Sequence, residues 1–176
     1  MIRSDKYLFL KYGSYALLML GFFLLQSSRG TALSLWGAAV DALPFLVAAV
    51  ALLDGPYAGG AFGFAAGVLT TINSPGVEGF SSLYLTLFGV LFGLFGAYYL
   101  RTILFSALAG GMLCMALEAL FRYVFYDLLF FGMTVGQALT AFGLKLLLSL
   151  PVGALAYALV RLIHRRFTEE NAIRAV

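Results

Sequence analysis

The sequence predicts an all-α integral membrane protein, a compact bundle of about six transmembrane helices with almost no soluble part. Two observations lead to this fold class. Of the 176 residues, 62% are hydrophobic and 11% are charged, whereas a soluble domain carries roughly 25% charged residues. In addition, apolar stretches close to the roughly 20 residues that a membrane span requires follow one another along the chain. The mean hydropathy of +0.99 agrees with lipid as the surrounding solvent.

Glycine, proline and charged residues divide the apolar sequence into six candidate spans. Pro56 is suited to the first turn of a helix, and Arg101 is the polar residue between the fourth and fifth spans. We interpret residues 1–176 as a single transmembrane domain with a basic cytoplasmic tail at 164–176. The predicted spans are 12–28, 35–53, 56–72, 81–100, 102–126 and 134–163.

Lysine and arginine are distributed unevenly between the two sides of these spans. With both termini inside, Arg29 is the one basic residue in an outer loop, and cytoplasmic segments normally carry the excess of positive charge. We therefore expect the N- and C-termini in the cytoplasm, and the basic tail is suited to anionic lipid headgroups. The residues expected on the cytoplasmic side are Arg3, Lys6, Lys11, Arg101, Arg161, Arg165, Arg166 and Arg174.

Two of the predicted spans carry glycines at intervals that place them on one helix face. Such a face lets a neighbouring backbone approach closely, which is how helices associate in lipid. Two interpretations stay open: packing inside the bundle, or docking onto the helix of a partner or of a second copy. The glycines are Gly59, Gly63 and Gly67 in the third span and Gly89, Gly93 and Gly96 in the fourth.

Four ionisable residues lie inside predicted spans: Asp41, Glu118, Arg122 and Lys145. Charges in lipid are costly and usually pair or face a cavity, and Glu118 and Arg122 are spaced to pair on one helix face. A rise of about 1.5 Å per residue places all four in the outer half of the membrane. We expect one network that ties the second, fifth and sixth spans together and opens outward. It fixes helix register, lines a polar cavity or partner site, or couples protons or ions.

Pro44 lies inside the second predicted span, so we expect it to kink that helix. A single cysteine, Cys114, excludes an intramolecular disulfide, and the single histidine, His164, has arginines rather than metal ligands beside it. The sequence contains no Ser-His-Asp set and no paired-carboxylate pattern, so catalysis is not expected. We expect no cofactor, no metal and no nucleic-acid partner.

The order of these features resembles the MreD family of bacterial rod-shape-determining membrane proteins. The resemblance covers most of the chain after the first span and depends on pattern more than on an invariant motif. Its parts are Gln26, the Asp41-Ala-Leu-Pro44 and Leu53-Asp-Gly-Pro56 segments, the glycine-rich stretch 59–67, the Arg101 loop, Glu118, and Pro151 before the basic end.

The resemblance implies a non-catalytic scaffold in the bacterial cytoplasmic membrane. MreD-like proteins act in cell-wall elongation and in cell shape together with MreC, MreB, RodA and a class B penicillin-binding protein. The family is also similar in fold to the six-helix S-components of energy-coupling factor transporters. The alternative function is therefore an S-component-like subunit that binds a small molecule such as a vitamin, with the outer network and the loop containing Glu78 as its pocket.

Overall fold

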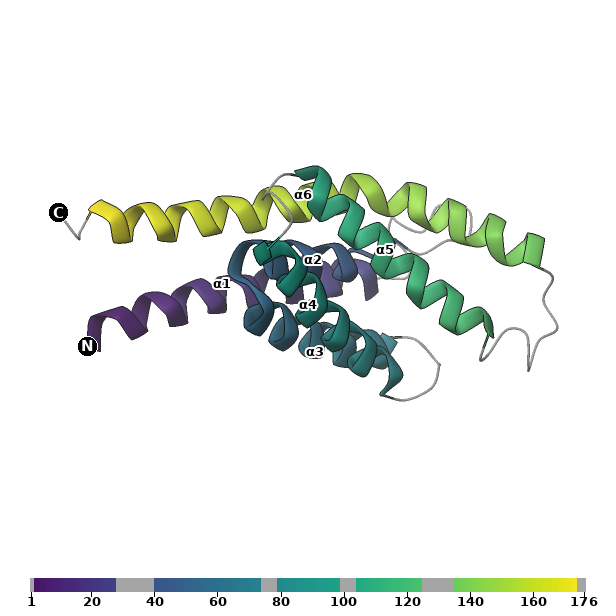
Figure 1. Ribbon diagram of the computed structural model, residues 1–176, viewed down its shortest axis with the longest axis horizontal. Coiled ribbons are helices and arrows are strands. Elements are labelled where there is room, and N and C mark those ends of the chain that lie inside the picture. The colour runs from purple at the N-terminus through teal and green to yellow at the C-terminus, as the bar shows by residue number, and fades with distance from the viewer. Residues whose placement is uncertain (1, 28–39, 74–78, 99–103, 125–134, 174–176) are drawn as a thin grey trace.

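The computed structural model describes residues 2–27, 40–73, 79–98, 104–124 and 135–173, and these residues form six helices and no strand (Figure 1). The prediction of an all-helical chain is therefore confirmed. Glu78 and Arg101 lie outside the described residues. The helices are α1 (Ile2–Ser27), α2 (Leu43–Asp54), α3 (Pro56–Asn73), α4 (Phe80–Tyr98), α5 (Leu104–Arg122) and α6 (Val135–Ile173).

Three helical segments are long and apolar enough to cross a membrane: Leu8–Ser27, Leu104–Arg122 and Phe142–Phe167. Two further apolar helices, Leu43–Asp54 and Phe80–Gly96, are shorter. These segments support the expected membrane character. A count of six spans and the orientation of the termini stay predictions.

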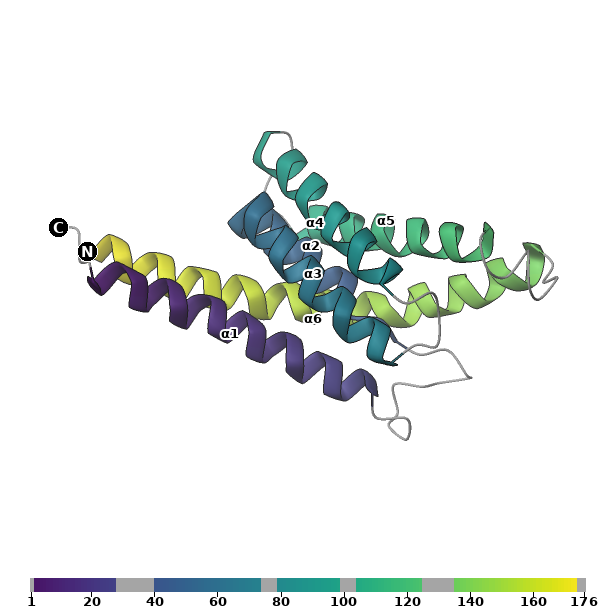
Figure 2. The same cartoon turned by 90° about the horizontal axis from the view of Figure 1, so that it is seen from below.

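The helix α2 forms the centre of the bundle. Every residue from Leu43 to Leu52 is buried, and α2 packs against each of the other five helices. The pair α3 and α4 has the most extensive contact in the fold. The helices α1 and α6 contact each other, and Figures 1 and 2 show the N-terminal part of α1 and the C-terminal part of α6 extending from the same end of the bundle. Both helices extend beyond the predicted spans at this end, because the polar residues next to the apolar stretches are also helical.

The predicted kink at Pro44 is wrong. Residues 40–42 are not helical, α2 begins at Leu43, and Pro44 lies in its first turn. A proline in the first turn disturbs nothing, because the N–H that it lacks has no helical partner there. The part of the predicted span from 35 to 39 lies outside the described residues.

The turn between α2 and α3 consists of Gly55 alone. Its φ of 88° is in the region that glycine adopts without strain. The Gly55 N–H donates to the Ala51 carbonyl at 3.1 Å and ends α2, while its carbonyl accepts from the Gly59 N–H at 3.0 Å. Pro56 then begins α3. The tight turn brings α3 back along the central helix.

Candidate functional site

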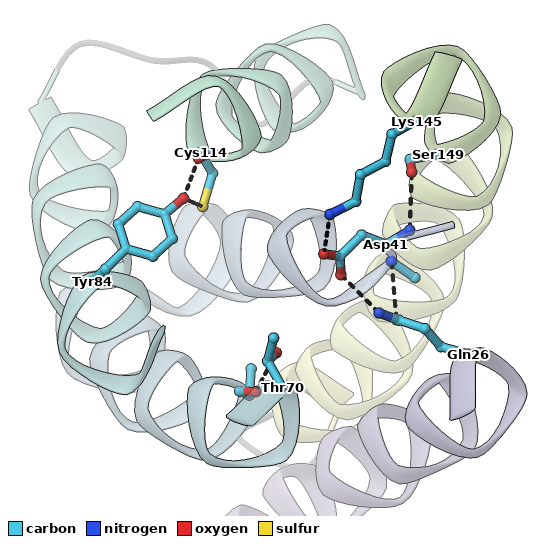
Figure 3. Close-up of polar contacts among 9 residues, drawn as sticks. Gln26, Asp41, Thr70, Tyr84, Cys114, Lys145 and Ser149 are labelled. Carbon is cyan, nitrogen blue, oxygen red and sulfur yellow. Dashed lines mark hydrogen bonds and ion pairs between the residues drawn. The ribbon is translucent and has the colours of Figure 1, made fainter. Parts of the chain in front are cut away.

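Asp41, immediately before α2, is the centre of a polar cluster at one end of the bundle, here called the outer cluster. Its Oδ2 lies 3.1 Å from Nζ of Lys145 on α6, and its Oδ1 accepts a hydrogen bond of 3.1 Å from Nε2 of Gln26 on α1. Figure 3 shows both side chains directed toward the Asp41 carboxylate. One carboxylate therefore joins three helices that are distant in sequence.

The backbone at the start of α2 uses the same neighbours. The Asp41 N–H donates to Oγ of Ser149 at 3.0 Å, and the Ala42 N–H donates to Oε1 of Gln26 at 3.4 Å. The first N–H groups of a helix have no partner inside it, and in an apolar interior each unpaired group is costly. Ser149 is fully buried. Gln26 and Ser149 thus satisfy backbone groups that water satisfies in a soluble protein.

The four charged residues that we expected in one network differ in their exposure and in their contacts. The side chain of Asp41 is 6% exposed and that of Lys145 is 30% exposed. Glu118 on α5 is partly buried and lies within electrostatic range of Asp41, Lys145 and Arg122. Arg122 is exposed, and among the described residues it forms no ion pair with Glu118. The Asp41–Lys145 pair is therefore the close contact, and Glu118 interacts with it only at longer range.

A second polar cluster, here called the inner cluster, lies at the opposite end of α2. Asp54, the last residue of α2, has a side chain that is 6% exposed. Its Oδ1 pairs with Nζ of Lys11 on α1 and lies 3.1 Å from Nδ1 of His164 on α6. The same three helices are therefore joined at both ends of α2.

Aromatic side chains of α1 lie next to the inner cluster. Tyr12 and Tyr15 both contact the ring of Phe62 on α3, with centroids 6.3 and 5.9 Å apart. The Tyr15 hydroxyl faces Asp54. Within the described part of the chain, the Tyr15 hydroxyl oxygen and Asp54 Oδ2 are buried and form no hydrogen bond of acceptable geometry. The inner cluster is thus less completely satisfied than the outer one.

A further polar contact joins α4 to α5 at the Asp41 end. The Tyr84 hydroxyl donates to the carbonyl oxygen of Cys114 and also contacts its sulfur (Figure 3). Thr70 on α3 bonds back to the carbonyl of Ala66 at 2.9 Å, within its own helix. Cys114 is buried and free. These groups satisfy one another inside the chain.

All six glycines singled out from the sequence lie against neighbouring parts of the same chain. Gly59 faces Gly89, Gly63 faces Leu85, and Gly67 faces Ser82. An added Cβ at Gly93 would lie 2.6 Å from Cα of Pro56, and one at Gly96 would lie 3.1 Å from Leu52 Cδ1. These positions serve packing within the bundle, mainly between α3 and α4, where a side chain on either helix would separate the backbones.

An open, mainly apolar groove of about 630 Å³ lies between α3 and α4. Tyr57 and Phe64 belong to its lining and are 92% and 58% exposed. The Thr86 hydroxyl also lines the groove but bonds back to the Ser82 carbonyl. The residues that line the groove are Pro56, Tyr57, Gly60, Ala61, Phe64, Thr86, Val90 and Leu94.

Sequence reasoning missed Ser149 and the inner cluster. A lone serine in an apolar helix gives no signal, because its role depends on a backbone group more than one hundred positions away. The inner cluster had a usable signal. Lys11, Asp54 and His164 stand next to the ends of three predicted spans that face the same side of the membrane, and this arrangement brings charges of both signs to one depth.

Among the described residues, no three His, Cys, Asp or Glu side chains are grouped closely enough to hold a metal ion. The arrangement can hold helices in register and neutralise buried charge. Comparison with known proteins finds no match to a family model, to a curated protein or to a solved structure.

Proposed function

We propose that this chain is a non-catalytic membrane scaffold of the bacterial cell-wall elongation machinery. It crosses the bacterial cytoplasmic membrane six times with both termini in the cytoplasm. It binds MreC and, through MreC, the actin-like MreB, RodA and a class B penicillin-binding protein. The resemblance of the sequence to the MreD family supports the choice of machinery and partners.

The observation that carries the scaffold proposal is that Asp41 is satisfied within the chain. Its two carboxylate oxygens and its backbone N–H each have a partner, namely Lys145, Gln26 and Ser149. A buried carboxylate is stable when its charge is paired and its remaining lone pairs are hydrogen-bonded. A residue used in this way fixes helix register and has little capacity left for a ligand.

The glycine faces decide where on this scaffold a partner can bind. Because Gly59, Gly63 and Gly67 are covered by α4, they are not free to receive a partner helix. The groove lined by Tyr57 and Phe64 is an apolar hollow that a partner helix or a lipid chain can enter. We place the contact with MreC there.

The alternative, an S-component-like binder of a small molecule, has less support. It requires several polar side chains that converge on a cavity and are not already paired. Tyr84 and Thr70 are engaged with the carbonyls of Cys114 and Ala66, and Asp41 is fully paired. The groove described above has an apolar lining, which does not suit a water-soluble vitamin.

The test is affinity purification of the tagged protein from its native membrane in mild detergent, followed by mass spectrometry. We expect to recover MreC and wall-synthase components, and we expect Phe64→Ala to reduce the MreC yield. Leu147→Ala is the matched control, because Leu147 is a large apolar residue on α6 with similar exposure, 66% against 58%.

Equal loss of MreC from both variants would remove the groove from the proposal. Recovery of an energy-coupling membrane subunit with ATPases, in place of MreC, would overturn the scaffold function itself. In that case, vitamin binding would be measured on the purified protein.

A further inference from the structure

The helix α1 packs against α6, α3 and α2, and its polar contacts with the bundle lie at the two ends of α2. Much of its surface is not covered by protein: Phe9, Leu17 and Leu24 are 83%, 75% and 67% exposed. Among residues 8–27, whose burial the structure describes, three are buried: Tyr15, Met19 and Phe22. In lipid, apolar exposure carries no penalty, so the hydrophobic effect does not press such a helix onto its neighbours. Polar contacts therefore contribute a large part of its attachment.

The two polar attachments of α1 differ in kind. At the outer cluster, the neutral amide of Gln26 bonds to Asp41 and to the Ala42 N–H. The Asp41 charge there is paired by Lys145 of α6, not by α1. At the inner cluster, α1 itself supplies a cation, because Lys11 pairs with Asp54. Attachment of α1 thus depends on the Asp54 charge at the inner end and on hydrogen bonds at the outer end.

The inner cluster also concentrates its contacts on one atom. Lys11 and His164 both approach Asp54 Oδ1, while Oδ2 and the facing Tyr15 hydroxyl lack a hydrogen bond in the part of the chain that the structure describes. Lys11 and His164 are 14% and 25% exposed, so they lie at the edge of the bundle while Asp54 is enclosed. The contact between the buried Asp54 carboxylate and these partners at the edge of the bundle is stable only while the opposite charges are present.

We propose that Asp54 is a latch: its charge holds the inner half of α1 against α2 and α6, and neutralising it lets that half swing outward about the Gln26–Asp41 contact. The aromatic contacts of Tyr12 and Tyr15 with Phe62 lie beside the latch and open with it. The moving part includes the N-terminal end of α1, which extends from the same end of the bundle as the C-terminal end of α6 (Figures 1 and 2).

The test measures distances between spin labels by pulsed electron paramagnetic resonance on the full chain in lipid nanodiscs. Cys114 is first replaced by alanine. One label pair, at Leu8 and Leu162, reports on the inner ends of α1 and α6, and a second pair, at Leu24 and Leu147, reports on their outer ends. All four side chains are exposed, so labels fit without disturbing the core.

With Asp54→Asn, we expect the inner pair to shift to longer and broader distances while the outer pair keeps its distribution. The exchanged variant Lys11→Asp with Asp54→Lys restores the opposite charges and is expected to return the inner pair toward the parent distance. Lys11→Gln, which leaves Asp54 with His164, serves as a milder variant if Asp54→Asn does not fold.

Unchanged inner distances in Asp54→Asn, or in Lys11→Gln where that variant is used, would overturn the latch and show that packing alone holds α1. An equal shift of both label pairs would also overturn it, because α1 would then detach as a whole. Failure of the charge exchange to restore the inner distance would show that the ion pair is not what closes the structure.

Discussion

Placing a methyl group at Gly67 tests whether the α3–α4 contact depends on backbones in direct approach. A Cβ built at Gly67 would approach Ser82 Cα most closely, and it would lie 2.6 Å from the Ser82 nitrogen and 2.7 Å from the Ser81 carbonyl oxygen. Non-bonded atoms of this kind prefer a separation of about 3.5 Å. The helices must therefore separate by at least roughly 1 Å at this point, since the contact with the Ser82 nitrogen alone requires 3.5 − 2.6, or about 0.9 Å. The obstacle is backbone, so no side-chain rotation relieves it.

The expected magnitude follows from overpacking and from lost dispersion contacts. Forcing extra atoms into a packed contact costs about 1–3 kcal/mol, and a radial gap of 0.5–1 Å forfeits roughly a quarter to a half of each contact's attraction. Alanine is also the better helix former, by about 1 kcal/mol. Gly21→Ala is the control, because an added Cβ at Gly21 meets nothing within 4 Å and gains the same helix propensity. The difference between the two variants therefore isolates the packing cost.

The assay is thermal unfolding of the purified protein in detergent, followed by circular dichroism and by size-exclusion chromatography. At about 2–4 °C per kcal/mol for a chain of this size, we expect Gly67→Ala to melt roughly 2–12 °C below Gly21→Ala. Equal melting temperatures would refute the reasoning, since they would mean that α3 and α4 separate without loss or do not touch at Gly67.

Four further substitutions test the outer cluster by the same unfolding assay. Asp41→Asn leaves Lys145 unpaired and is expected to cost about 3 kcal/mol; the added change Lys145→Met should recover part of this loss, and no recovery would contradict the ion pair. Ser149→Ala removes the acceptor of the Asp41 N–H and should cost about 1–3 kcal/mol, which a neutral result would contradict. Glu118→Gln should cost less than Asp41→Asn, because Arg122 is exposed and unpaired with Glu118 in the described structure; a larger loss would show that Glu118 carries the network.

The boundaries of the helices could be predicted from the sequence where a local residue pattern marks the end of a helix. Gly55 and Pro56 mark the boundary between α2 and α3, because one adopts a positive φ and the other fits a first turn. The spacing of Gly59, Gly63 and Gly67 likewise specifies a smooth face without reference to any other segment. Which helix covers that face is a tertiary property, so the sequence alone could not decide between packing inside the bundle and docking onto a partner.

The start of α2 was not predictable from local pattern. The apolar run from 35 to 53 has the length of a span, and Pro44 inside it suggested a kink. The non-helical segment ends at Ala42, because Ser149 and Gln26 accept hydrogen bonds from the N–H groups of Asp41 and Ala42. These partners are 108 and 16 positions away from the groups they bind. No window along the sequence contains that information.

The length of α2 explains why the buried charges of this protein gather where they do. At 12 residues, α2 is about 18 Å long, well short of the roughly 30 Å of a hydrocarbon core. The two ends of α2 cannot both reach water. Each end of a helix nevertheless has backbone groups without helical partners. In lipid, such groups must be satisfied by protein.

Asp41 and Asp54 stand at these two ends, and α1 and α6 supply a polar partner to each of them. The outer cluster thus satisfies backbone groups at the start of the short central helix, while the inner cluster pairs the charge of Asp54 at its other end. We therefore expect substitutions in either cluster to disturb helix placement first and any partner binding second. Loss of MreC without loss of stability on changing Asp41 would contradict this order and would make the outer cluster a binding site.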